Sequence, residues 1–117
     1  MRLTLTFAGA FALVSGAAFA DPLTIDLPGA ASAERTTVAY SCGGDRKVTA
    51  EYVNAGANSL AIVYLGEKTL LMVSVLSGSG ARYAGQQYIW WTKGDSADFH
   101  DLTKGENAAP EFSCKAG

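Results

Sequence analysis

Most of the side chains that could carry chemistry lie in one segment of the sequence, SGSGARYAGQQYIWWTKGD. It opens with Ser77 and Ser79 among glycines, in a small-residue loop that exposes their hydroxyl groups. It closes with Lys93, which precedes a glycine turn. A hydroxyl both donates and accepts hydrogen bonds, whereas an ammonium group only donates and carries a positive charge. This pair indicates either a nucleophile with its base or two contacts to the polar groups of a partner.

An enzymatic role would use Ser79 as the nucleophile and Lys93 or His100 as the base. The sequence has neither the G-x-S-x-G elbow nor the S-x-x-K spacing of serine nucleophiles, and its glycine loop lacks the G-K-[ST] of a phosphate loop. His100 follows Phe99 and precedes Asp101, which is typical of a surface strand histidine. Two cysteines and one histidine at scattered positions do not fit a structural zinc site. We therefore expect no enzyme, no metal and no cofactor.

The basic and aromatic residues of the same segment favour recognition of another protein. Arg82 and Tyr83 follow the serine loop, and two adjacent tryptophans precede Thr92. Neighbouring residues of a strand point to opposite faces, so one of Trp90 and Trp91 is expected in the core and the other nearer the surface. The sequence does not indicate which. Exposed aromatic side chains beside arginine are frequent in protein interfaces.

The elements that must position these residues are β-strands. Short runs of β-branched and aromatic residues alternate with Gly, Asn and Asp turns, and no stretch after residue 20 has an apolar face at helical spacing. The strands are expected at 37–42, 47–53, 60–65, 69–76, 82–83, 87–92, 97–102 and 111–114. Strands joined by tight turns pair antiparallel, and a closed sheet leaves no free edge. The sequence therefore predicts an all-β fold, a small closed eight-stranded antiparallel β-barrel, in preference to a sandwich.

The expected barrel is packed and tied by one disulfide. An eight-stranded barrel is just wide enough for its own side chains to fill, which argues against a lipocalin-like ligand cavity. The side chains expected to fill it are Tyr40, Tyr52, Tyr64, Leu70, Met72, Tyr88, Trp90, Phe99 and Phe112. Cys42 and Cys114 allow a single pairing, which would stabilise the fold by roughly 4 kcal/mol on the chain-entropy model.

The start of the chain predicts export. Residues 1–20 have one basic residue, an apolar run and a final A-x-A, as a cleaved signal peptide does, and an uncleaved membrane anchor is the alternative. Cleavage before Asp21 would leave an extended leader, 21–36, with room for an edge strand at 23–25, and a single domain, 37–117. Paired cysteines suit the oxidising compartment that an exported protein enters.

The charge of the exported part excludes one class of partner. Without the signal peptide the chain has eight Lys and Arg side chains against eleven Asp and Glu. A nucleic-acid binder would instead carry a basic stripe on its surface. The acidic balance slightly favours a cationic partner. The sequence does not distinguish a monomer from a homodimer.

Two motifs, SGSGARY and the later WTKG, resemble those of the bacterial inhibitors of c-type lysozyme, the MliC/PliC family. The resemblance extends over about residues 37–115. It implies an eight-stranded barrel that binds lysozyme and blocks its active-site cleft. It also implies that Ser79 and Lys93 enter the cleft, with Tyr83, Arg82, Ser77 and Thr92 in the surrounding contact.

The resemblance further implies a place in the cell envelope. The membrane-bound branch of the family carries a lipid on an amino-terminal cysteine, and the expected first mature residue here is Asp21. The chain therefore looks like the soluble periplasmic branch, without a membrane anchor. The alternative function is an envelope β-barrel interaction module that binds another protein or a glycan.

Overall fold

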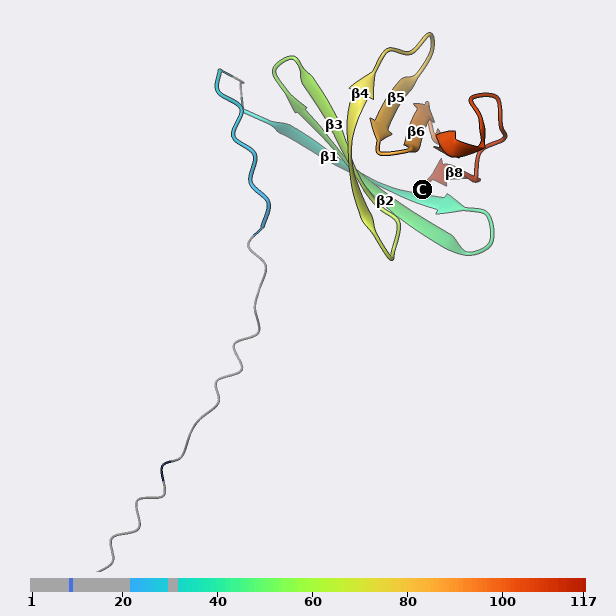
Figure 1. Ribbon diagram of the computed structural model, residues 1–117, viewed down its shortest axis with the longest axis horizontal. Coiled ribbons are helices and arrows are strands. Elements are labelled where there is room, and N and C mark those ends of the chain that lie inside the picture. Colours follow the sequence, from blue (N-terminus) through green and yellow to red (C-terminus); the bar gives the residue numbers. More distant parts are fainter. Residues whose placement is uncertain (1–8, 10–21, 30–31) are drawn as a thin grey trace, which may run out of the picture.

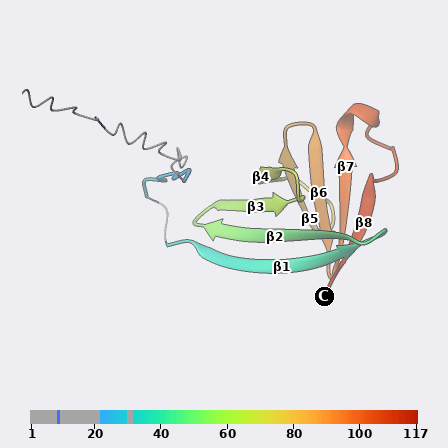
Figure 2. The ribbon, with the colours of Figure 1, turned by 90° about the horizontal axis from the view of Figure 1, so that it is seen from below.

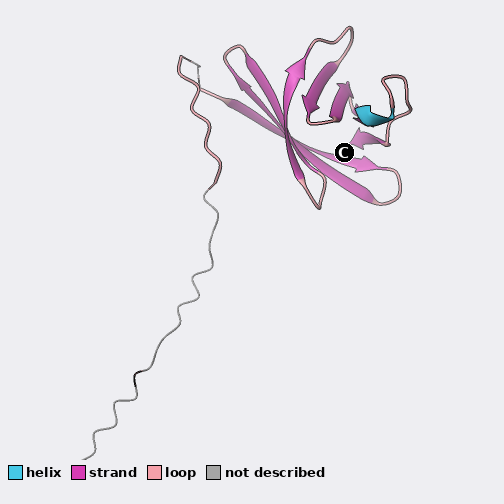
Figure 3. Ribbon diagram, in the orientation of Figure 1, coloured by secondary structure: helices cyan, strands magenta, loops and turns pink. Residues whose placement is uncertain are grey.

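In the part of the chain that the structure describes, eight β-strands follow one another, and each pairs antiparallel with the next until β8 returns to β1. The computed structural model describes residues 9, 22–29 and 32–117. Figures 1 and 3 show the strands wrapping around one axis, with a short 3₁₀ helix before the last strand. The elements are β1 (Glu34–Cys42), β2 (Arg46–Ala55), β3 (Asn58–Tyr64), β4 (Thr69–Val75), β5 (Ala81–Gly85), β6 (Tyr88–Lys93), β7 (Ser96–Asp101), η1 (Leu102–Lys104) and β8 (Phe112–Ala116).

The seam between β1 and β8 closes the barrel. Tyr40 pairs with Ala116 across this seam, and Cys42 pairs with Cys114. The two cysteines form a disulfide between positions 72 residues apart. The predicted closed antiparallel barrel and its disulfide are thus confirmed. Figure 2 shows β1 and β2 as long curved strands, with β5 to β8 turned steeply away from them.

The interior of the barrel is filled by side chains that alternate along each strand. Trp90 is fully buried at its centre, together with Met72, Val48 and Val63. Trp90 is therefore the core tryptophan of the pair. The other expected core residues are buried or packed against the buried cluster, with one exception.

Tyr64 is that exception, and its expected place in the core was wrong. Its side chain lies on the outer face of β3 and is 39% exposed. The inward positions of this strand are Ala61 and Val63, both fully buried. A strand period of two residues fixes which positions share a face but not which face is inside, and β3 has apolar residues on both.

Hydrogen bonds link three aromatic side chains in the interior. The indole Nε1 of Trp90 donates a hydrogen bond to the Tyr52 hydroxyl at 2.9 Å, and that hydroxyl lies 2.6 Å from the hydroxyl of Tyr40. The Tyr40 and Trp90 rings also meet edge to face. Burial raises the pKa of Tyr52 well above its ordinary value. The phenol stays neutral and satisfies the buried indole N–H, a group that is costly to leave unpaired.

The amino-terminal boundary of the barrel differs from the prediction. β1 begins at Glu34, so three residues assigned to the leader pair with the end of β2. Residues 22–29 hold no strand, so the expected edge strand at 23–25 was wrong. The predicted signal peptide lies outside the described residues apart from Gly9. Across the described part of the chain, no helix is both long and apolar enough to span a bilayer.

Candidate functional site

The serine loop and the lysine turn lie at the same end of the barrel. The serine loop, residues 76–80, connects β4 to β5, and the lysine turn, residues 93–95, connects β6 to β7. Because β5 and β6 are paired, Ala81 at the end of the loop lies opposite Thr92 at the start of the turn. The structure therefore brings together the two segments that carry Ser79 and Lys93.

Gly80 is where the two segments touch. Its φ of 66° lies in the left-handed region that favours glycine. A Cβ atom added at this position would lie 2.1 Å from the carbonyl oxygen of Thr92 and 2.8 Å from Cγ of Lys93. No side chain fits in that space without moving backbone. The absence of a Cβ lets the serine loop rest directly on the lysine turn.

Ser79 is exposed at the tip of the loop, and its backbone carbonyl oxygen is held from two sides. The Nε1 group of Trp91 donates a hydrogen bond to this oxygen at 2.8 Å, and the Ser77 hydroxyl donates a second. The Thr92 hydroxyl likewise donates to the carbonyl oxygen of Ala81 at 3.3 Å. Ser77 and Thr92, both expected in the contact, thus use their hydroxyls to hold the loop.

Two cations lie over the ring of Trp91. Nζ of Lys93 is 4.6 Å from the ring centroid, and Cζ of Arg82 is 5.7 Å from it. Lys93 is exposed, whereas Arg82 and Trp91 are half-buried on the outer surface. Cations attract the negative face of an aromatic ring, most strongly that of tryptophan. Two cationic side chains thus lie over the ring whose Nε1 group binds the loop of the exposed Ser79.

Tyr83 faces inward, away from this surface. Its side chain is buried, and its ring centroid lies 5.6 Å from that of Tyr52. Burial raises the pKa of the Tyr83 phenol. Tyr83 pairs with Trp90 and Arg82 pairs with Trp91, so the register places the first pair inside and the second outside. Trp91 is therefore the surface aromatic of this region, a role that the sequence left open between Trp90 and Trp91.

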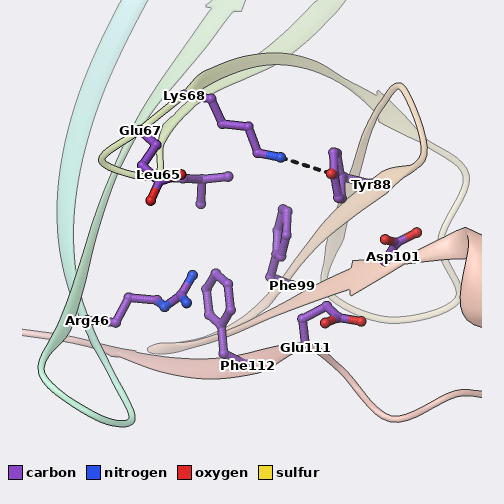
Figure 4. A pocket seen from close by; sticks show the side chains of 9 residues that line it. All are labelled: Arg46, Leu65, Glu67, Lys68, Tyr88, Phe99, Asp101, Glu111 and Phe112. Carbon is purple, nitrogen blue, oxygen red and sulfur yellow. Dashed lines mark hydrogen bonds between the residues drawn. The ribbon is translucent and has the colours of Figure 1, made fainter.

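A hollow with a volume of about 570 Å³ lies at the opposite end of the barrel. One wall is a column of stacked rings, Tyr88, Phe99 and Phe112, and Lys68 and Arg46 lie over its two ends (Figure 4). The packed interior thus opens into a hollow at this mouth.

Two of the acidic residues that line the hollow, Asp101 and Glu111, already have bonding partners. Hydrogen bonds from Thr103 lower the pKa of Asp101, which caps η1. Glu111 forms an ion pair with Lys104 at 2.6 Å, which raises the pKa of that lysine. Within the described residues no cluster of His, Cys, Asp and Glu could hold a metal ion.

Comparisons with known proteins support the family that the motifs of the serine loop and the lysine turn indicate. A family model described as "membrane-bound lysozyme-inhibitor of c-type lysozyme" matches residues 40–108. A protein of that description from Pseudomonas aeruginosa is 44% identical over 90 residues, which are 76% of this chain and 71% of the relative. A second one, from Cupriavidus necator, is 44% identical over 80 residues, 68% of this chain and 64% of that relative.

A solved structure shares the barrel. It is a crystal structure of Pseudomonas aeruginosa MliC in complex with hen egg white lysozyme, with 39% sequence identity and a TM-score of 0.71. The match covers 85% of this chain and 99% of the MliC chain. The resemblance drawn from SGSGARY and WTKG is confirmed, and the family is one of inhibitors rather than enzymes. The chain belongs to the family of membrane-bound lysozyme-inhibitors of c-type lysozyme, MliC.

Proposed function

We propose that this protein inhibits c-type lysozyme by placing Ser79 and Lys93 in the active-site cleft of the enzyme. The observation that carries the proposal is the contact at Gly80, which holds the serine loop against the lysine turn. The two side chains come from neighbouring loops of one rigid, disulfide-tied barrel. The family and the lysozyme complex of the Pseudomonas relative support lysozyme as the partner.

The chemistry of the two side chains suits the target. Lysozyme works with two carboxyl groups, a protonated acid and an ionised carboxylate. The Ser79 hydroxyl can donate or accept, so it can bond to the acid in either protonation state. The Lys93 ammonium is positive and donor-only, so it matches the ionised carboxylate. Arg82 adds a second positive charge beside Lys93 on the same surface.

An assay of bacterial cell-wall lysis tests the proposal. A peptidoglycan suspension is mixed with hen egg white lysozyme and increasing amounts of the purified barrel, and the fall in turbidity is followed. We expect the wild-type protein to stop lysis. Lys93→Ala should weaken inhibition by about tenfold or more, because truncating one partner of a buried charge pair costs roughly 2–5 kcal/mol.

The chain offers a matched control for Lys93. Lys68 is also an exposed lysine over an aromatic ring, with Nζ 4.4 Å from the centroid of Tyr88, but it lies at the opposite end of the barrel. Lys68→Ala should inhibit as well as the wild type. Wild-type potency in the double variant Ser79→Ala/Lys93→Ala would overturn the site. A wild-type barrel without effect on lysis would favour the alternative, an envelope module for another protein or a glycan.

We also propose that the protein acts in the periplasm after removal of residues 1–20. The composition of this segment supports the proposal, as does the disulfide, which suits an oxidising compartment. The two relatives are described as membrane-bound. Cell fractionation followed by amino-terminal sequencing distinguishes the cases: we expect a periplasmic protein that begins at Asp21. Recovery in the membrane fraction with residues 1–20 intact would contradict it.

A further inference from the structure

We propose that Trp91 is the positioning residue of the lysozyme contact, a single indole that holds both the serine loop and the lysine turn in their binding geometry. The inference rests on the proposed function. It assigns to Trp91 a task that is separate from core packing, which Trp90 performs. Trp91 acts through Ser79 and Lys93 rather than by its own contact with the enzyme.

The position of Trp91 on the sheet suits this task. It lies on the outer face of β6, opposite Arg82 of β5 on one side and Asp98 of β7 on the other. Its side chain is half-buried, and on β7 its ring also faces His100, at 6.4 Å between ring centroids. Trp91 is thus fixed between two neighbouring strands, just below the two loops.

The edge of the indole holds the serine loop. Nε1 of Trp91 donates to the carbonyl oxygen of Ser79 at 2.8 Å, a bond between residues 12 apart in sequence. The loop gains little from apolar packing, because Leu76 is 95% exposed and Gly78 has open space around it. The indole bond therefore ties the tip of a small-residue loop to the rigid barrel wall.

The face of the indole holds the lysine turn. Nζ of Lys93 lies 4.6 Å from the Trp91 ring centroid, and Arg82 approaches the same ring at 5.7 Å. A free lysine has many side-chain conformations, and ordering it on binding reduces affinity. Resting on the ring narrows those conformations before lysozyme arrives.

Two substitutions distinguish the contribution of the indole N–H group to binding from that of the aromatic face. Trp91→Phe keeps an aromatic face but removes the N–H group, and should weaken lysozyme binding about fivefold, the worth of one hydrogen bond. Trp91→Leu removes both, and should weaken it about twentyfold. Binding is measured calorimetrically with hen egg white lysozyme, and thermal unfolding of each free variant verifies that it folds. Tyr64→Leu, which removes an exposed ring from β3, should bind like the wild type.

A double-mutant cycle tests whether Trp91 acts through the two loops. In the Ser79→Ala/Lys93→Ala background, Trp91→Leu should weaken binding by less than about twofold, because the two side chains through which the indole acts are then absent. A full twentyfold effect in that background would show direct contact with lysozyme and overturn the inference. Wild-type affinity of Trp91→Leu alone would also overturn it. Failure of the proposed function is a separate result, namely wild-type affinity of Ser79→Ala/Lys93→Ala.

Discussion

Because Gly80 has no Cβ atom, the serine loop and the lysine turn of the candidate site can touch. At this position the residue type matters twice, once for the left-handed φ and once for the space that a Cβ would need. The sequence indicated the first requirement, since glycines in a Gly-Ser loop commonly adopt positive φ. It could not indicate the second, because the close approach of Thr92 depends on the register of β5 against β6.

Gly80→Ala should therefore lower both stability and inhibition. A strained φ alone costs roughly 1–3 kcal/mol, and the clash with the Thr92 carbonyl adds to it by pushing the loop off the turn. We expect a lower denaturant midpoint and clearly weaker inhibition in the lysis assay. Gly78→Ala is the control two residues away, because Gly78 lacks a positive φ and has nothing within 4 Å. Equal behaviour of the two variants would contradict the assigned contact.

The arrangement of strands was largely predictable, whereas the inward face was not predictable for every strand. Turn residues between short apolar runs gave eight strands, and the barrel has eight. In β3, however, apolar residues stand on both faces, so Tyr64 was placed inside when it is outside. For Trp90 and Trp91 the sequence indicated only that their side chains point to opposite faces of the strand. The registers with β5 and β7 decide that Trp90 is inside.

The tyrosine on β2 gives a stability prediction. Tyr52→Phe removes the acceptor of the buried Trp90 indole and the partner of the Tyr40 hydroxyl. Leaving a buried N–H unpaired should lower the free energy of unfolding by roughly 1–3 kcal/mol in urea denaturation. Tyr64→Phe removes an exposed hydroxyl at 3.5 Å from Glu51 and should change it little. If the two variants lose the same stability, the buried chain of hydroxyls is not what supports the barrel.

Two buried tyrosines, one on β2 and one on β5, determine how stability depends on alkaline pH. Burial raises the pKa of Tyr52 and of Tyr83 above the ordinary value of 10.0. Their stabilising effect is fully present below pH 10.0, where both phenols are neutral in the folded and unfolded chains. Above that pH the unfolded chain releases these protons and the folded barrel retains them, so stability falls. The free energy of unfolding of Tyr52→Phe, measured in a denaturant series, should fall less steeply between pH 9 and 11 than that of the wild type. An unchanged slope would exclude Tyr52 as a cause.

For the whole molecule, the disulfide is the strongest single constraint on the unfolded chain. It joins the end of β1 to β8, 72 residues apart, at the seam that closes the barrel. Cys42→Ala/Cys114→Ala should lower the free energy of unfolding by roughly 4 kcal/mol on the chain-entropy model. Chemical denaturation of oxidised wild type and the variant measures this difference. A loss below about 1 kcal/mol would indicate that hydrogen bonding at the seam suffices.

Closure of the sheet also bears on how the protein can diversify. Each of the eight strands has a hydrogen-bonded neighbour on both sides, so a partner must be recognised by side chains of the loops and outer surface rather than by strand addition. The tips of such loops can change sequence while the strand ladder keeps its pairing. A scaffold of this kind can follow an evolving enzyme by exchanging a few tip residues, without redesigning its fold.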